Sequence, residues 1–280
     1  MGIAAGFLMQ AISGNMNDTR FLQNFTERIK ANGMSPEQIE KLSEILKDDG
    51  RVVFFGGAGV STESGIPDFR SEQGLYKAKQ EYGYSPEEIL SHSFFMRNEE
   101  IFFDYYKKNL IYNNAKPNKA HLGLAKLEEN GKLSAVITQN IDGLHQLAGS
   151  KNVYELHGSI LRNSCMQCDA KYDLAYIMDD DHCTGTVPKC EKCGSTVKPD
   201  VVLFEEALDD YQITNGIREI SAADTLIVGG TSLVVYPAAG LISYFKGKNL
   251  ILINRDKTPY DSRANLVIHE KIGKVFEEII

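Results

Sequence analysis

Short apolar segments that alternate with helical patterns constrain the fold of this chain more than any other feature. The helical pattern at residues 36–49 begins with Ser35, Pro36 and Gln38 arranged as a capped helix start. Near-continuous apolar strands joined by helices are typical of a parallel sheet covered on both faces. We therefore predict an α/β fold with a Rossmann-like parallel sheet and helices on both faces. The apolar segments are residues 51–55, 133–138, 225–228 and 249–254, and the other helical patterns are residues 117–130 and 237–245.

Four of the five cysteines form two closely spaced pairs. Cys165 and Cys168 make the first pair, and Cys190 and Cys193 make the second. Each Cys-x-x-Cys pair can offer two thiolates to one tetrahedral ion, and four thiolates leave no open position for water. The spacing thus predicts a structural zinc site. The alternatives are two disulfides, which would need an oxidising compartment, or four unrelated thiols. Cys183 has no partner at ligand spacing, and we expect it to be a half-buried thiol.

Two segments interrupt the alternation of strands and helices. Residues 71–116 are rich in Tyr and Phe at helical spacing, and residues 162–197 contain all the cysteines. We expect a helical insertion at 71–116 and a zinc module at 162–197, which together form a smaller lobe. The Rossmann-like body would then consist of residues 17–70, 117–161 and 198–280. A ligand is expected in the cleft between body and lobe.

The charge and hydropathy of the chain exclude two classes of partner. Its formal net charge is −8, whereas nucleic-acid binding depends on clustered Lys and Arg, so we expect no direct nucleic-acid contact. No segment reaches the roughly 18 apolar residues that a membrane-spanning helix needs, so no membrane partner is expected. Residues 1–16 are predicted to be a disordered extension. They lack the basic start of a secretory signal, which favours a cytoplasmic location.

A glycine-rich turn follows the first apolar segment. Gly57, Ala58 and Gly59 would let the backbone approach a phosphate and place N–H groups at a helix start. The usual dinucleotide fingerprint requires a third glycine where this chain has Thr62. A hydride-transfer dehydrogenase is therefore disfavoured.

The next turn, residues 64–70, has an unusual composition. Its Asp68, Phe69 and Arg70 bring an acid, an aromatic face and a fixed cation to one place. Such groups can bind an amide, cover a reactive sugar carbon and hold a phosphate. The alternative is a surface loop with an incidental Asp–Arg pair.

Polar residues also follow the other apolar segments. Gln139, Asn140 and Asp142 come after residues 133–138, at the end of a strand where open α/β sheets bind ligands. His157 follows a strand-like segment and precedes a glycine, which leaves room for a substrate. Histidine is also suited to proton abstraction near neutral pH. The histidines at 92, 121, 145, 182 and 269 have no such neighbourhood, so we expect them to be core or surface residues.

Found together in this order, these motifs make the chain similar to the bacterial members of the sirtuin family, which are NAD-dependent protein deacetylases. The likeness extends over about residues 36–278. In that family NAD lies in the cleft, and the acyl oxygen of an acetylated lysine attacks C1′ of the nicotinamide ribose and releases nicotinamide. The motifs that carry the likeness are Gly-Ala-Gly-Val-Ser, Ser-Gly-Ile-Pro-Asp-Phe-Arg, Thr-Gln-Asn-Ile-Asp, His-Gly-Ser, the two cysteine pairs, Gly-Thr-Ser and Asn254.

The resemblance implies a role for each matching residue. His157 and Asn140 would be catalytic, with His157 as general base and Asn140 holding the ribose. Asp68 would complete the nicotinamide pocket, and Phe69 would shield the sugar carbon from water. The NAD-binding residues implied in this way are Gly57, Ala58, Gly59, Thr62, Ile66, Asp68, Phe69, Arg70, Gln139, Asn140, Ile141, Asp142, His157, Gly230, Thr231, Ser232, Asn254 and Ile272.

The resemblance also implies the partners of the chain. An acetylated-lysine protein or peptide would add as a strand between residues 202–204 and 233–235, and such backbone pairing gives a loose sequence preference. The acyl group would pass an apolar channel near Ile141 and Val202. The stretch 71–116 has no Tyr-x-x-Arg pair that would recognise a dicarboxylic acyl group, which favours acetyl-lysine.

Two residues depart from the family pattern. Gly56 stands where many members have threonine, and Glu205 stands where glycine is usual, which adds a charge at the peptide groove. Two other functions remain open. An ADP-ribosyltransferase would use the same NAD site with a protein side chain as acceptor, and a catalytically silent protein would bind NAD without consuming it.

Overall fold

A computed structural model describes residues 26–27, 29, 33–48, 50–68 and 71–279. The predicted disordered extension at 1–16 lies outside the described residues, as do Phe69 and Arg70 of the acid–aromatic–cation turn. In the part of the chain that is described, we find no helix with the length and apolar character needed to cross a membrane.

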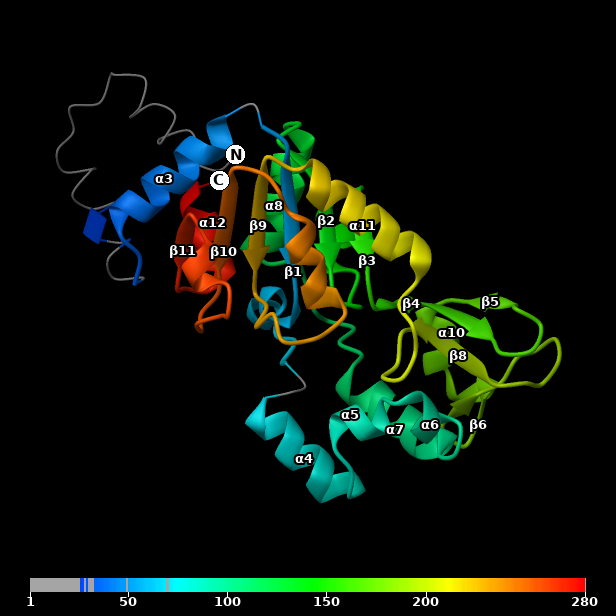
Figure 1. Ribbon diagram of the computed structural model, residues 1–280. Coiled ribbons are helices and arrows are strands. Elements are labelled where there is room, and N and C mark those ends of the chain that lie inside the picture. The colour runs from blue at the N-terminus through cyan, green and yellow to red at the C-terminus, as the bar shows by residue number, and fades with distance from the viewer. Residues whose placement is uncertain (1–25, 28, 30–32, 49, 69–70, 280) are drawn as a thin grey trace.

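The core of the molecule is a six-stranded sheet in the order β11-β10-β9-β1-β2-β3, in which every neighbouring pair is parallel (Figure 1). The apolar segments at 51–55, 133–138, 225–228 and 249–254 all form strands of this sheet, so the predicted α/β fold is confirmed. The strands are β1 (Val52–Gly56), β2 (Leu133–Thr138), β3 (Val153–Glu155), β9 (Thr225–Gly229), β10 (Asn249–Ile253) and β11 (Leu266–Ile268).

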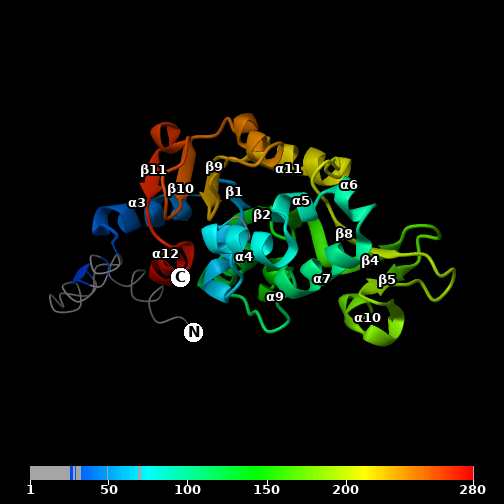
Figure 2. The ribbon, with the colours of Figure 1, turned by 90° about the horizontal axis from the view of Figure 1, so that it is seen from below.

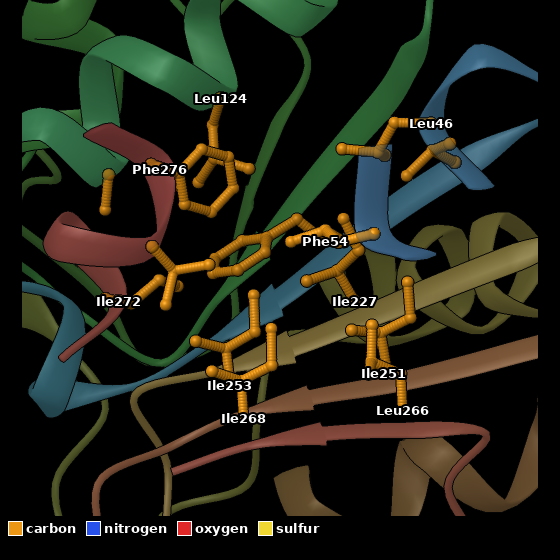
Figure 3. Close-up of a cluster of buried hydrophobic side chains, with 14 of the residues drawn as sticks. Leu46, Phe54, Leu124, Ile227, Ile251, Ile253, Leu266, Ile268, Ile272 and Phe276 are labelled. Carbon is orange, nitrogen blue, oxygen red and sulfur yellow. The ribbon is translucent and has the colours of Figure 1, made fainter. Parts of the chain in front are cut away.

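Helices cover both faces of the sheet because β1 sends its buried side chains alternately to each face. Phe54 packs on one face among Leu124, Ile272 and Phe276, as Figure 3 shows. Phe55 belongs to the core on the other face. The first face is covered by α3 (Pro36–Lys47), α8 (Lys119–Glu129) and α12 (Ile272–Ile279), and the second by α11 (Asp210–Ala222) and the 3-10 helix η4 (Ala238–Tyr244).

The sequence predicted some of these helices better than others. Ser35 caps α3 and forms a reciprocal capping box with Gln38, as the pattern indicated. The segment at 237–245 is a 3-10 helix rather than an α-helix. Gly240 is a poor helix former within this short segment, and the Ser243 hydroxyl donates to the Gly240 carbonyl (2.7 Å). Neither α11 nor α12 was among the predicted helices.

A second lobe packs around its own hydrophobic core, below and beside the sheet in Figure 1 and in front of and to the right of it in Figure 2, which shows the molecule from below. Phe95, Phe102, Phe103 and Tyr106 of the helical insertion share this core with Val197 of the zinc module. The lobe contains α4 (Glu72–Tyr82), α5 (Pro86–Ile89), α6 (His92–Phe95), α7 (Glu99–Asn109), the antiparallel sheet β5 (Lys171–Tyr172), β4 (Gly158–Cys165) and β8 (Val197–Val201), α10 (Leu174–Met178), and the hairpin β6 (Cys183–Thr184) and β7 (Val187–Pro188).

Candidate active site

A cavity of about 260 Å³ lies where the carboxyl ends of the central strands face the second lobe. Both parts of the molecule line it. Residues that follow β1, β2 and β3 form one wall, and residues from the helical insertion form another. The lining residues from the strand ends are Ala58, Ser61, Ile66, Pro67, Gln139, Asn140, Ile141, Asp142 and His157, and those from the insertion are Leu90, Tyr106, Asn109, Leu110 and Tyr112.

The glycine turn after β1 packs directly on the backbone that follows β9. The Gly59 N–H donates to the Gly230 carbonyl at 2.8 Å. A Cβ on Gly59 would lie 2.7 Å from the Gly230 Cα, and one on Gly57 would lie 2.9 Å from the Thr231 Cβ. Only residues without a side chain permit this approach, which packs the two loops together next to Ala58 of the cavity wall.

The Ser61 hydroxyl connects the polar side chains at the cavity wall through hydrogen bonds. It is 1% exposed, and its hydroxyl donates to Asp142 Oδ2 at 2.6 Å. The same oxygen accepts from Asn140 Nδ2 at 3.0 Å and contacts His121 Nε2 at 3.5 Å. The N–H of Leu144 donates to the other Asp142 oxygen at 2.9 Å. Asn140 and Asp142, from one loop, are thus held in position by a serine far away in sequence.

The backbone fixes the proton positions in this network. His121 Nδ1 accepts from the Asn118 N–H (3.3 Å), so the ring proton is on Nε2 and points to Ser61. Burial lowers the pKa of His121 to about 4, an effect that the nearby Asp142 carboxylate partly opposes. Both observations indicate a neutral imidazole at pH 7, which donates to Ser61 rather than carrying charge into the site.

His145 lies behind His121, with ring centroids 4.7 Å apart. It is 1% exposed, and neither of its ring nitrogens has a hydrogen-bond partner among the described residues. Burial, with a smaller contribution from His121, lowers its pKa to about 3. A neutral histidine pair therefore supports the back of the Ser61 network.

His157 lines the cavity and its ring orientation is fixed. Nδ1 lies 2.9 Å from the carbonyl oxygen of Gln139, and because a carbonyl can only accept, Nδ1 carries the proton. The other nitrogen, Nε2, is therefore the atom that can take up a proton. The Gln139 side chain in turn donates to Thr231 Oγ1 at 3.1 Å, which ties this loop to the end of β9.

The four paired cysteines come together in the second lobe. All four sulfurs lie within 4.8 Å of one another, with Cys165 and Cys193 at 3.3 Å and Cys168 and Cys190 at 3.6 Å. A tetrahedral zinc with Zn–S bonds of about 2.3 Å requires S–S separations of about 3.8 Å, so the set fits. All five cysteines are free thiols, which disfavours the disulfide alternative.

Comparison with known proteins decides the family. The Sir2 family model matches residues 57–237. An NAD-dependent protein deacetylase from Clostridium acetobutylicum is 62% identical over 244 residues, which cover 87% of this chain and 98% of that protein. Another from Clostridium perfringens is 62% identical over 245 residues, with 87% and 99% covered. The chain belongs to the Sir2 family.

A solved structure supports the same assignment. A complex described as Sir2 with a p53 peptide and NAD⁺ is 38% identical, covers 86% of this chain and 96% of that one, and has a TM-score of 0.76. The fold expected from the sirtuin resemblance is thus present throughout the described body and second lobe.

The cavity brings together part of the predicted Sir2 site. The predicted residues that line it are Ala58, Ile66, Gln139, Asn140, Ile141, Asp142 and His157. Other predicted residues belong to neighbouring loops or to the start of α12 and do not line this cavity, namely Gly57, Gly59, Thr62, Asp68, Gly230, Thr231, Ser232, Asn254 and Ile272. Phe69 and Arg70 lie outside the described residues.

Two residues of this Sir2 site were missed from the sequence. Ser61 lies two residues after the glycine turn, as the last residue of the Gly-Ala-Gly-Val-Ser motif, and its place in that motif was the available signal. His121 was expected to be an ordinary core residue; it is fully buried, but it contacts Ser61 at the cavity wall. His121 lies three residues after Asn118 and forms a capping box with it at the start of α8. This local feature of the helix does not indicate a contact with Ser61.

Proposed function

We propose that this chain is an NAD-dependent protein-lysine deacetylase in which His157 acts as the general base. The reaction releases nicotinamide and transfers the acyl group to ADP-ribose. The observation that carries the proposal is the fixed tautomer of His157, which presents Nε2 as a proton acceptor in the same cavity as Asn140 and Asp142. NAD supplies the electrophilic sugar carbon when bound, and the protein positions the groups around it.

Asn140 and Asp142 would bind the ribose and the nicotinamide amide. Ser61 holds both side chains, so the hydrogen-bonding atoms facing a ligand are oriented before it binds. Ile66 and Pro67 contribute apolar side chains to the lining of the same cavity and would exclude water from the reacting carbon. Gly57, Gly59, Gly230 and Thr231, in the two loops that pack together next to Ala58 of the cavity wall, would lie near the phosphates.

An acetylated-lysine peptide would enter between residues 202–204 and 233–235. Exposed apolar side chains stand on both sides of this entrance, with Phe204 39%, Val234 60% and Tyr236 69% exposed. Phe204 and Tyr236 also line the cavity. Apolar side chains at a groove mouth are suited to covering the aliphatic stem of lysine.

We further propose that the protein works in the cytoplasm. The four clustered thiols hold zinc only while they are reduced, and a reducing compartment maintains that state. An ADP-ribosyltransferase remains the second candidate function because it would use the same NAD site. His157 favours deacetylation, since a base is needed to complete acyl transfer after nicotinamide has left.

The decisive assay follows nicotinamide and acetyl-ADP-ribose by mass spectrometry after mixing the protein with NAD and an acetyl-lysine peptide. We expect both products in equal amounts and a deacetylated peptide. His157→Ala should bind NAD but lose about 10²–10⁴-fold in kcat/KM. His182→Ala, which changes a histidine outside the cavity, should retain the rate. ADP-ribose attached to protein without deacetylation would favour the transferase, and an unimpaired His157→Ala rate would refute the base assignment.

A further inference from the structure

The zinc module places a tyrosine hydroxyl against one of the four clustered sulfurs. Tyr172 is the last residue of β5, and its hydroxyl lies 3.1 Å from the Sγ of Cys190. Cys190 is buried, with 3% of its surface exposed. A zinc-bound cysteine is a thiolate, which has no proton to give. The phenol of Tyr172 is therefore the donor of this hydrogen bond.

This contact distinguishes Cys190 from the other three cysteines of the set. Among the residues that the structure describes, Tyr172 is the one side chain outside the four that hydrogen-bonds a sulfur of the cluster. Four thiolates bring more negative charge to the site than one Zn²⁺ neutralises. A donor that reaches one of these sulfurs therefore stabilises the metal-bound state and orients the ligand.

The ring of Tyr172 is held in place independently of its hydroxyl. It stacks on Tyr176 of α10, with centroids 4.0 Å apart and planes inclined by 29°. Tyr176 stacks in turn on His182, with centroids 3.9 Å apart and planes inclined by 15°. The Tyr176 hydroxyl donates to the carbonyl of Lys189 at 2.8 Å, so it binds backbone and not sulfur. The aromatic stack between β5 and α10, which Figure 1 shows at the outer end of the second lobe, thus fixes the direction of the Tyr172 phenol.

We propose that Tyr172 is a positioning residue of the zinc site, which strengthens zinc binding by orienting the Cys190 thiolate through its hydrogen bond to the sulfur. Partners of this kind contribute about 10–100-fold to metal affinity. The inference goes beyond the proposed deacetylase function and does not depend on it, because zinc binding is measured without NAD or a peptide.

Competition with a chromogenic zinc chelator tests this role in the full-length protein. Tyr172→Phe keeps the stacked ring and removes only the hydroxyl, and we expect it to weaken zinc binding by about 10–100-fold. Tyr176→Phe is the matched control, because it removes a phenol from the same stack that contacts no sulfur. It should bind zinc as tightly as the wild type. Unchanged zinc binding in Tyr172→Phe, or equal weakening in the two variants, would overturn the proposal.

Cobalt(II) in place of zinc separates the hydrogen bond from a general effect on folding. The energy of sulfur-to-cobalt charge-transfer absorption depends on the electron density at the thiolates, and a hydrogen bond to sulfur draws density away from the metal. The band should therefore move to longer wavelength in Tyr172→Phe and stay in place in Tyr176→Phe. Weaker zinc binding in Tyr172→Phe with an unmoved band would assign the loss to the stability of the module and reject the hydrogen bond as its cause.

Discussion

The reactive side chains of this protein are oriented by residues that do not face the ligand. Ser61 accepts from Asn140 and His121 and donates to Asp142, so one hydroxyl satisfies three neighbours. Each of these groups would otherwise be a poorly paired polar atom near a buried wall, and such atoms cost free energy. The hydrogen bonds to Ser61 therefore orient Asn140 and Asp142 in the folded protein before any ligand binds.

Ser61→Ala tests this positioning. The change removes the shared hydroxyl, and we expect a loss of about 1–2 kcal/mol in the free energy of unfolding and a drop of about tenfold or more in kcat/KM. Urea unfolding and nicotinamide release measure the two effects. Ser64→Ala is the control, because its hydroxyl accepts from Asn118 but does not contact Asn140 or Asp142. Equal rates in the two variants would show that Ser61 does not orient the site.

The buried histidines make stability depend on pH. Burial lowers the pKa of His145 to about 3 and that of His121 to about 4, from an ordinary value of 6.5. Between about pH 6.5 and pH 4 the unfolded chain therefore binds more protons than the folded chain. Their contribution to stability is fully present above pH 6.5 and is lost as the pH falls toward 4.

His145→Leu should reduce this acid sensitivity. Leucine has a similar volume and no ring nitrogen to protonate, so the loss of stability between pH 7 and pH 5 should be smaller by about 2 kcal/mol. Urea midpoints across that range measure the slope. His182→Leu, at a partly exposed site, should keep the wild-type slope. Parallel curves for His145→Leu and the wild type would contradict the prediction.

At the scale of elements, the zinc module combines several very short strands with the four-cysteine cluster. The strands of this module are short: β5, β6 and β7 contain two residues each. Such short strands bury little apolar surface by themselves. The four cysteine sulfurs, from the end of β4, the segment after it and the segment between β7 and β8, lie within 4.8 Å of one another. Metal binding there is coupled to folding, because the unfolded chain has no preformed site.

Cys190→Ser should therefore lower stability through the loss of metal. We expect zinc to fall from about one ion to near zero per chain and the module to become sensitive to protease. Elemental analysis and limited proteolysis are the measurements. Cys183→Ala removes a thiol from the same module and should retain its zinc. A fully zinc-loaded Cys190→Ser protein would exclude the four-thiolate site.

At the scale of the whole molecule, the chain passes from β3 of the sheet into β4 of the second lobe at a single junction that sets the position of His157. His157 is at this junction, and its carbonyl accepts from the Val202 N–H at 3.0 Å. Gly158, which begins β4, has φ +77°, and a Cβ there would lie 1.9 Å from the Asp200 carbonyl oxygen. The position of the proposed base relative to both lobes thus requires a glycine.

Gly158→Ala should disturb both the fold and the site. Besides the cost of a left-handed conformation, about 1 kcal/mol, the new methyl group would push β4 away from β8 and shift His157. We expect a lower Tm and a loss of more than tenfold in kcat/KM. In Gly131→Ala the conformation is also left-handed (φ +73°), but nothing lies within 4 Å, so only the strain applies. Equal effects of both substitutions would show that the close approach is unimportant.

Local patterns in the sequence determined every strand of the central sheet except β11, together with helix α3 and the zinc ligands. The strands were predictable because buried parallel strands are almost continuously apolar, and the cysteines because each pair of ligands is local. The tertiary structure alone decided that Ser61 and His121 support the polar groups of the site. Ser61 and Asp142 are 81 residues apart, and the sequence around each residue does not indicate that the two will form a hydrogen bond. Only folding brings such side chains together, because hydrogen bonding and burial depend on distance in space and not on separation along the chain.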